Sequence, residues 1–143
     1  MDFTRSAKDV AKDLVGRVIE VHGKNYEIVE TEAYEGGEQT ARRHCMRLAP
    51  GQVGVMPFRG LYFVNVGTKA AGEPSCVLLR ALQTQDGVID GPGRVGKALD
   101  AQNIEYLLVG KDIPLTGQTK DSRFSKPEEK SDNSQGRYRM AGV

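Results

Sequence analysis

Residues 28–34 read Ile28-Val29-Glu30-Thr31-Glu32-Ala33-Tyr34 and predict a β-strand with two acids and an aromatic ring at alternate positions. Successive side chains of a strand point to opposite faces of the sheet. Val29, Thr31 and Ala33 are therefore expected to face the core, and Glu30, Glu32 and Tyr34 the other side. Two residues of strand rise place the Glu32 carboxylate roughly 7 Å from the Tyr34 ring along the chain. A carboxylate beside an aromatic platform is what an enzyme needs to activate water next to a stacked ring.

The surrounding sequence predicts a sheet around this strand. Residues 17–21 and 26–34 form the arms of a hairpin whose turn is His22-Gly23-Lys24-Asn25. Two further runs, 61–66 and 76–82, are apolar enough to be central strands.

Helices are few in this sequence. A short helix is expected to be capped by Thr4 or Ser6 and to run through Leu14, with Gly16 terminating it, and the glycine-rich turn at 91–99 opens a second one. Residues 35–52 are turn-rich and predict a loop. The expected C-terminal features are a flexible excursion at 117–137, rich in polar residues, and a short closing strand at 137–140. Together these features predict a single α+β domain over residues 1–143.

The composition excludes several classes of protein. A formal net charge of +1 excludes a histone-like, tail-driven nucleic-acid binder but not a domain with a local basic face. Four arginines, with Glu38 as the one acid among them, give such a face: Arg42, Arg43, Arg47 and Arg59. The two cysteines form no recognisable disulfide framework or metal pair, so a reducing compartment is expected. With no signal peptide and no apolar run near 20 residues, we expect a cytoplasmic protein, nucleoid-associated if bacterial, with no membrane partner.

Two polar residues interrupt the apolar strands. Arg80 shares a predicted face with Cys76, Leu78 and Leu82, and a buried arginine needs a carboxylate or phosphate partner. It either forms a salt bridge to Glu30 or another acid, or contacts an anion or a water at the site of Glu32. Asn65 also needs partners, and it either serves the site or ties down a neighbouring loop.

Residues 91–96 fit the pattern G-x-G-x-x-G, but not in the context of a dinucleotide site, because no βαβ unit surrounds them. This turn is either a helix start whose backbone amides meet a phosphate or a plain helix-opening turn. His44 is read as a solvated side chain, no cluster has metal-site spacing, and Ser75 and Cys76 lack a partnered base.

Three blocks of the sequence together resemble the signature blocks of the alkyladenine (3-methyladenine) DNA glycosylases. These blocks are residues 29–34, residues 76–82, and residues 90–94 continuing to Lys97-Ala98-Leu99. The segment 13–16 also resembles the end of that family's opening helix, and Arg137-Tyr138-Arg139 its closing segment. The resemblance runs in order over most of the chain.

The resemblance implies a compact domain with a curved, mostly antiparallel sheet, flanking helices, and neither metal nor cofactor. It implies a monomer that flips a damaged purine out of double-stranded DNA and hydrolyses its bond to deoxyribose. By position in the motifs, Glu32 would activate water, Tyr34 would stack on the base, and Arg80 would hold the water and a phosphate. Asn65 falls at or near the family's purine-discriminating amide. Two groups of residues would contact phosphates. They are the four arginines of the local basic face (Arg42, Arg43, Arg47 and Arg59) and the residues Gly93, Arg94 and Lys97 of the glycine-rich turn and the helix that it opens.

The chain also departs from the family pattern. The loop after Tyr34 is about ten residues shorter than in the family, and the pocket histidine has no aligned counterpart unless His44 replaces it in space. Met56 stands where the family has a second pocket tyrosine, and Arg59 stands where it has the tyrosine that fills the gap left by the flipped base. The catalytic strand is thus kept while the flipping apparatus is altered.

We therefore expect a DNA glycosylase acting on cationic alkylated purines. A non-catalytic nucleic-acid-binding relative is the second hypothesis, and a small nucleotide-binding enzyme built on the glycine-rich turn is the third. Pro92 counts against the third hypothesis because it removes a backbone donor where a phosphate would sit.

Overall fold

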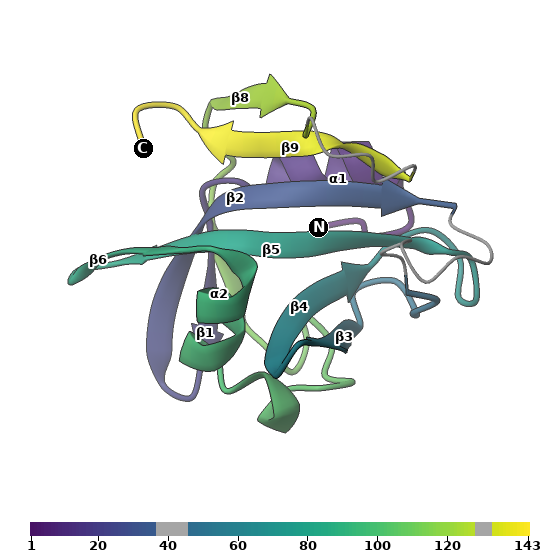
Figure 1. The fold of residues 1–143 in the computed structure, drawn as a ribbon, viewed down its shortest axis with the longest axis horizontal. Coiled ribbons are helices and arrows are strands. Elements are labelled where there is room, and N and C mark those ends of the chain that lie inside the picture. The colour runs from purple at the N-terminus through teal and green to yellow at the C-terminus, as the bar shows by residue number, and fades with distance from the viewer. Residues whose placement is uncertain (37–45, 128–132) are drawn as a thin grey trace.

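The computed structural model describes residues 1–36, 46–127 and 133–143, and these form one α+β domain around a nine-stranded sheet (Figure 1). The elements in chain order are α1 (Ala7–Leu14), β1 (Arg17–Val21), β2 (Lys24–Glu35), β3 (Val53–Phe58), β4 (Leu61–Gly67), β5 (Ser75–Thr84), β6 (Gly87–Asp90), α2 (Pro92–Ala98), a 3-10 turn (Ala101–Asn103), β7 (Leu115–Gly117), β8 (Ser122–Ser125) and β9 (Ser134–Met140). The strand order is β3-β4-β5-β2-β1-β7, with β6 paired to β5, and β9 paired to both β2 and β8. The pairings between these strands are antiparallel, so the expected fold class is confirmed.

The long strand β2 organises the sheet. One edge of β2 pairs with β5, and its other edge pairs first with β1 and then with β9. The register against β5 shifts between Ile28 and Thr31, and these irregularities mark a β-bulge. Bulges increase the local twist of a strand, which allows one strand to serve three neighbours.

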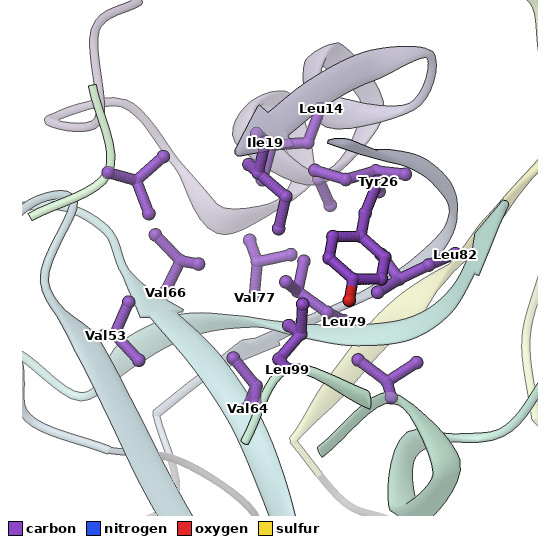
Figure 2. Packing of buried hydrophobic residues seen from close by; sticks show 14 of the residues in the cluster. Leu14, Ile19, Tyr26, Val53, Val64, Val66, Val77, Leu79, Leu82 and Leu99 are labelled. Carbon is purple, nitrogen blue, oxygen red and sulfur yellow. The ribbon is translucent and has the colours of Figure 1, made fainter. Parts of the chain in front are cut away.

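The main core lies on one face of this sheet. Val29, Thr31 and Ala33 are fully buried there, as the alternation predicts, and the Thr31 hydroxyl donates to the Ala11 carbonyl at 2.8 Å. Figure 2 shows the apolar side chains that fill this core, among them Leu14 from α1 and Leu99 after α2. Leu82 also belongs to this cluster. The prediction that it shares a face with Arg80 is therefore wrong, because the bulge interrupts the alternation of β5 relative to β2.

Helix α1 fixes the far end of β2. Ser6 is its N-cap and accepts from the Asp9 amide at 3.2 Å, so the predicted helix is confirmed with Ser6 rather than Thr4 as the cap. The Glu35 carboxylate accepts from the Ala7 amide at 2.8 Å, close to the positive end of the helix. The last residue of β2 is thereby tied to the first turn of α1.

The C-terminal region is more regular than the sequence predicts. The range 117–137, expected as a flexible excursion, contains β8 and the first residues of β9, which pair with each other. The Phe124 ring packs edge-on against the Tyr138 ring, with centroids 5.3 Å apart, and it covers Gly136. The mostly polar side chains of β8 hide this edge strand from a pattern-based prediction, and its stability comes from pairing with β9.

Candidate active site

The second face of the sheet carries the predicted site residues in adjacent rows. Glu32 pairs with Leu78 of β5, and Leu78 pairs with Asn65 of β4. Tyr34 lies one row further along, opposite Cys76. Directly paired residues of neighbouring strands share a face of the sheet. The structure therefore brings Glu32, Tyr34 and Asn65 together on the side opposite the main core.

An apolar cluster separate from the main core surrounds these rows. It consists of Tyr34, Cys76 and Leu78, with Met46 and Phe63 packed against it. Met46 and Leu48 lie over Gly54, where a Cβ atom would be 2.9 Å from the Met46 sulfur and 2.6 Å from a Leu48 methyl carbon. Gly54 pairs with Asn65, so Met46 and Leu48 cover one end of the site.

Glu32 is fully buried and has charged partners from two other strands. Its Oε1 atom lies 3.0 Å from Arg80 Nη1 and 3.2 Å from Arg137 Nε, and its Oε2 accepts a hydrogen bond of 2.7 Å from Ser134 Oγ. Arg137 Nε is close enough to Glu32 for an ion pair. Among the described residues, however, the Nε–H group of Arg137 has no acceptor in hydrogen-bond geometry. A buried carboxylate without such partners would be strongly destabilising. These contacts supply the charge partners and the hydrogen-bond donor that a buried carboxylate needs.

The ion pairs continue beyond Glu32 as a network. Arg80 Nε donates to Glu30 Oε1 at 3.0 Å, and Arg139 Nη1 lies 3.5 Å from Glu30 Oε2. Arg139 in turn binds Asp90 through two contacts of 3.2 and 3.0 Å. The salt-bridge alternative for Arg80 is therefore present, with Glu30 and Glu32 as its acids, and its contact with an anion or a water stays a prediction. Three acids and three arginines make this network formally neutral.

Tyr34 is a neutral phenol next to this charge. Burial raises the pKa of Tyr34 well above its ordinary value of 10.0, and the negative charge and hydrogen bond of Glu32 raise it further. The opposing effect of Arg80 and Arg137 on the pKa is smaller. The Tyr34 hydroxyl therefore keeps its proton at physiological pH and donates it in a hydrogen bond to the Glu32 carboxylate.

Asn65 is fully buried and bonded within the site. Its Nδ2 donates to the Phe63 carbonyl at 3.4 Å, and its Oδ1 lies 3.7 Å from Cys76 Sγ. Met56 pairs with Phe63 on the neighbouring strand and is half-buried. The amide is thus held in place on the face of the sheet that carries Glu32 and Tyr34.

The predicted DNA-contacting residues are spread over three places. Arg59 lies in the tight turn of the β3–β4 hairpin, with its guanidinium 5.3 Å from the centre of the Phe58 ring. Arg47 is exposed and donates to the Gly72 carbonyl at 2.9 Å. The remaining predicted residues of this loop, Arg42, Arg43 and His44, lie outside the described residues.

Helix α2 faces the hairpin across a groove. Arg94, Lys97 and Gly93 line this groove together with Leu61 and Tyr62. A Cβ atom at Gly93 would lie 2.8 Å from a Leu61 methyl carbon, and one at Gly96 would collide with the Tyr62 carbonyl oxygen. Close packing of α2 on β4 therefore explains two glycines of the G-x-G-x-x-G pattern. This packing fits the alternative of a plain helix-opening turn.

Comparison with known proteins places the chain in a family. Residues 1–132 match the model of the methylpurine-DNA glycosylase family. The chain belongs to this family. A putative 3-methyladenine DNA glycosylase of Rhodopseudomonas palustris (strain HaA2) is 36% identical over 68% of this chain and 60% of its own length. A protein of the same description from Synechococcus elongatus is 40% identical over 66% of this chain and 55% of its own length.

A rat relative described as DNA-3-methyladenine glycosylase is 36% identical over 60% of this chain and 32% of its own length. The chain thus spans about 60% or less of the length of each of these relatives. In the described residues, no helix is long and apolar enough to cross a membrane. Within the same residues, no group of three His, Cys, Asp or Glu side chains is arranged to hold a metal ion.

Sequence motifs predicted Glu32, Tyr34, Arg80 and Asn65 as site residues, and the structure brings them together, but the motifs missed the contribution of β9. Ser134 and Arg137 both reach Glu32, and nothing in the sequence around Ser134 indicates its contact. Only the alternation Arg137-Tyr138-Arg139 in the closing segment could have suggested that two cations share one face of a strand.

Proposed function

We propose that this chain is a DNA glycosylase that removes alkylated purines from double-stranded DNA, with Glu32 activating the water. The observation that carries the proposal is a buried carboxylate held by Arg80 and Ser134 on the face that also presents Tyr34 and Asn65. A buried carboxylate beside an aromatic ring and an amide provides a proton acceptor next to groups that can bind a base. Membership of the methylpurine-DNA glycosylase family supports the same reaction.

The reaction needs one proton acceptor and one leaving base. Glu32 takes a proton from water as the water oxygen bonds to C1′ of the deoxyribose, and the C1′–N bond breaks. The electron pair of that bond leaves with the purine. A purine alkylated at N3 or N7 is cationic and therefore leaves as a neutral base without prior protonation. The negative charge of Glu32 also stabilises the oxocarbenium character of the sugar.

The base would be held by the apolar cluster on the same face. Tyr34 supplies a neutral aromatic wall, worth about 1–3 kcal/mol per stacked base in comparable sites. Met56 supplies a softer wall, because a thioether packs well against a ring. Asn65, on the same face of the sheet, would discriminate among purines by hydrogen bonding.

The DNA backbone would lie along the hairpin and the groove beside α2. Phe58, Leu61 and Tyr62 are exposed at or beside the hairpin turn, and Arg59 accompanies them. Arg94 and Lys97 line the opposite side of the groove. Proteins that distort a duplex combine cationic side chains, which contact phosphates, with exposed apolar side chains, which insert between bases.

A base-release assay tests this function. Wild-type protein incubated with methylated duplex DNA should release 3-methyladenine or 7-methylguanine, and Glu32→Gln should lower the rate at least about 100-fold. The matched control is Glu27→Gln, on the same strand but paired with the exposed Lys120, which should keep the wild-type rate. Equal release by wild type and Glu32→Gln would refute the assignment of Glu32. Duplex binding without any base release would instead support the non-catalytic relative.

A further inference from the structure

Glu32 receives a hydrogen bond from a residue 102 positions away in the chain. The donor is Ser134 Oγ, which lies 2.7 Å from Glu32 Oε2, and both side chains are buried. The same Oγ accepts from the Gly136 amide at 3.3 Å. Because that amide occupies one lone pair of the hydroxyl, the hydroxyl proton is directed to Glu32.

A bulge in β9 places Ser134 on this face. Ala33 pairs with Gly136, but Tyr34 pairs with Ser134, so Gln135 has no opposing residue. In a regular ladder Ser134 would oppose Glu35, and its side chain would point to the core face. Gly136 has φ +113, a backbone conformation that L side chains rarely adopt, and it makes the bulge possible. Bulges of this kind occur often beside active sites, where they redirect a side chain.

We propose that Ser134 is a positioning residue that holds Glu32 in the orientation required to activate water, an inference that rests on the proposed function. A carboxylate has about four lone-pair sites. Arg80 and Ser134 each donate to one of them, and Arg137 Nε lies 3.2 Å from Oε1. By holding Oε2, Ser134 prevents the carboxylate from turning to offer the wrong oxygen to the attacking water.

The test compares Ser134→Ala with Ser134→Thr, which keeps the hydroxyl. Ser134→Ala should slow single-turnover base release about tenfold, while the Kd for the methylated duplex stays within about twofold of wild type. The acidic limb of its pH–rate profile should move to higher pH, because the charged carboxylate has lost a donor while Arg80, Arg137 and Tyr34 still face it. Ser134→Thr should restore both the rate and the profile. Thr68→Val, which removes a buried hydroxyl paired with Ser75 outside the ion network, should leave both unchanged.

A second readout is independent of activity. Carboxyl ¹³C NMR of Glu32 should show a titration midpoint at higher pH in Ser134→Ala than in wild type. An unchanged midpoint, or a wild-type rate and pH profile in Ser134→Ala, would overturn the inference. A wild-type protein that releases no base would refute the proposed function instead, and the NMR comparison would still decide whether Ser134 controls Glu32.

Discussion

Tyr34 shows how burial and a neighbouring charge act on one residue. Its pKa is raised mainly by burial and then by Glu32, so the folded protein holds the phenol proton where the unfolded chain releases it. Above pH 10 the unfolded state therefore binds fewer protons, and the free energy of unfolding falls as pH rises. The contribution of Tyr34 is fully present below that pH.

We expect Tyr34→Phe to make this decline shallower. Urea titrations of wild type and Tyr34→Phe at pH 8, 9.5 and 10.5 measure the free energy of unfolding. Only the wild type should lose the portion of this free energy that comes from the Tyr34 phenol. Tyr26→Phe is the comparison variant, since its hydroxyl donates to the Ala98 carbonyl on the other side of the sheet. Parallel curves for wild type and Tyr34→Phe would show that Tyr34 does not titrate differently on unfolding.

At the scale of elements, the packing of α2 on β4 joins the hairpin to the rest of the site. Gly96 approaches the Tyr62 backbone so closely that a side chain has no room, whereas Gly93 meets the end of the Leu61 side chain. Backbone cannot move aside as cheaply as a flexible side chain. Substitution at the two glycines should therefore have different costs.

Gly96→Ala should destabilise the protein by about 3 kcal/mol or more, because the new methyl group must displace α2 from β4. Gly93→Ala should cost less than about 1.5 kcal/mol, since Leu61 can change rotamer and alanine favours the helix. Chemical denaturation at pH 7 compares the two. Similar costs for both variants would contradict the packing described for α2.

On the scale of the whole molecule, a buried ionic site is separate from an exposed surface that the proposed function assigns to DNA. The hairpin and the groove beside α2 present Arg59, Arg94 and Lys97. With a net charge of +1, the chain has no strong overall attraction for DNA, so we expect the proposed DNA affinity to come from this local arrangement. The slope of log K against log salt is negative, and each lost phosphate contact reduces its magnitude by about 0.9.

The double variant Arg94→Gln/Lys97→Gln should therefore reduce the salt slope of duplex binding by about 1.8 if both side chains contact phosphates. Fluorescence anisotropy between 50 and 200 mM salt measures the slope. Lys12→Gln is the control, because Lys12 is exposed on α1, which covers the core face of the sheet. A double variant with the wild-type slope would exclude this groove from the interface.

The sequence alone determined which residues of β2 face together. Side-chain alternation in a strand is a local steric property, so Glu32 and Tyr34 share a face whatever the neighbouring strands are. The motifs likewise located Arg80 and Asn65 in apolar strands, where their polarity demanded partners. The tertiary structure alone decided what those partners are, and it formed strands at 53–58, 87–90 and 122–125 that the local pattern did not predict. Ser134 and Arg137 reach Glu32 because β9 pairs with β2 through a bulge. Pairing between distant strands depends on the whole sheet, so a local sequence pattern cannot predict it.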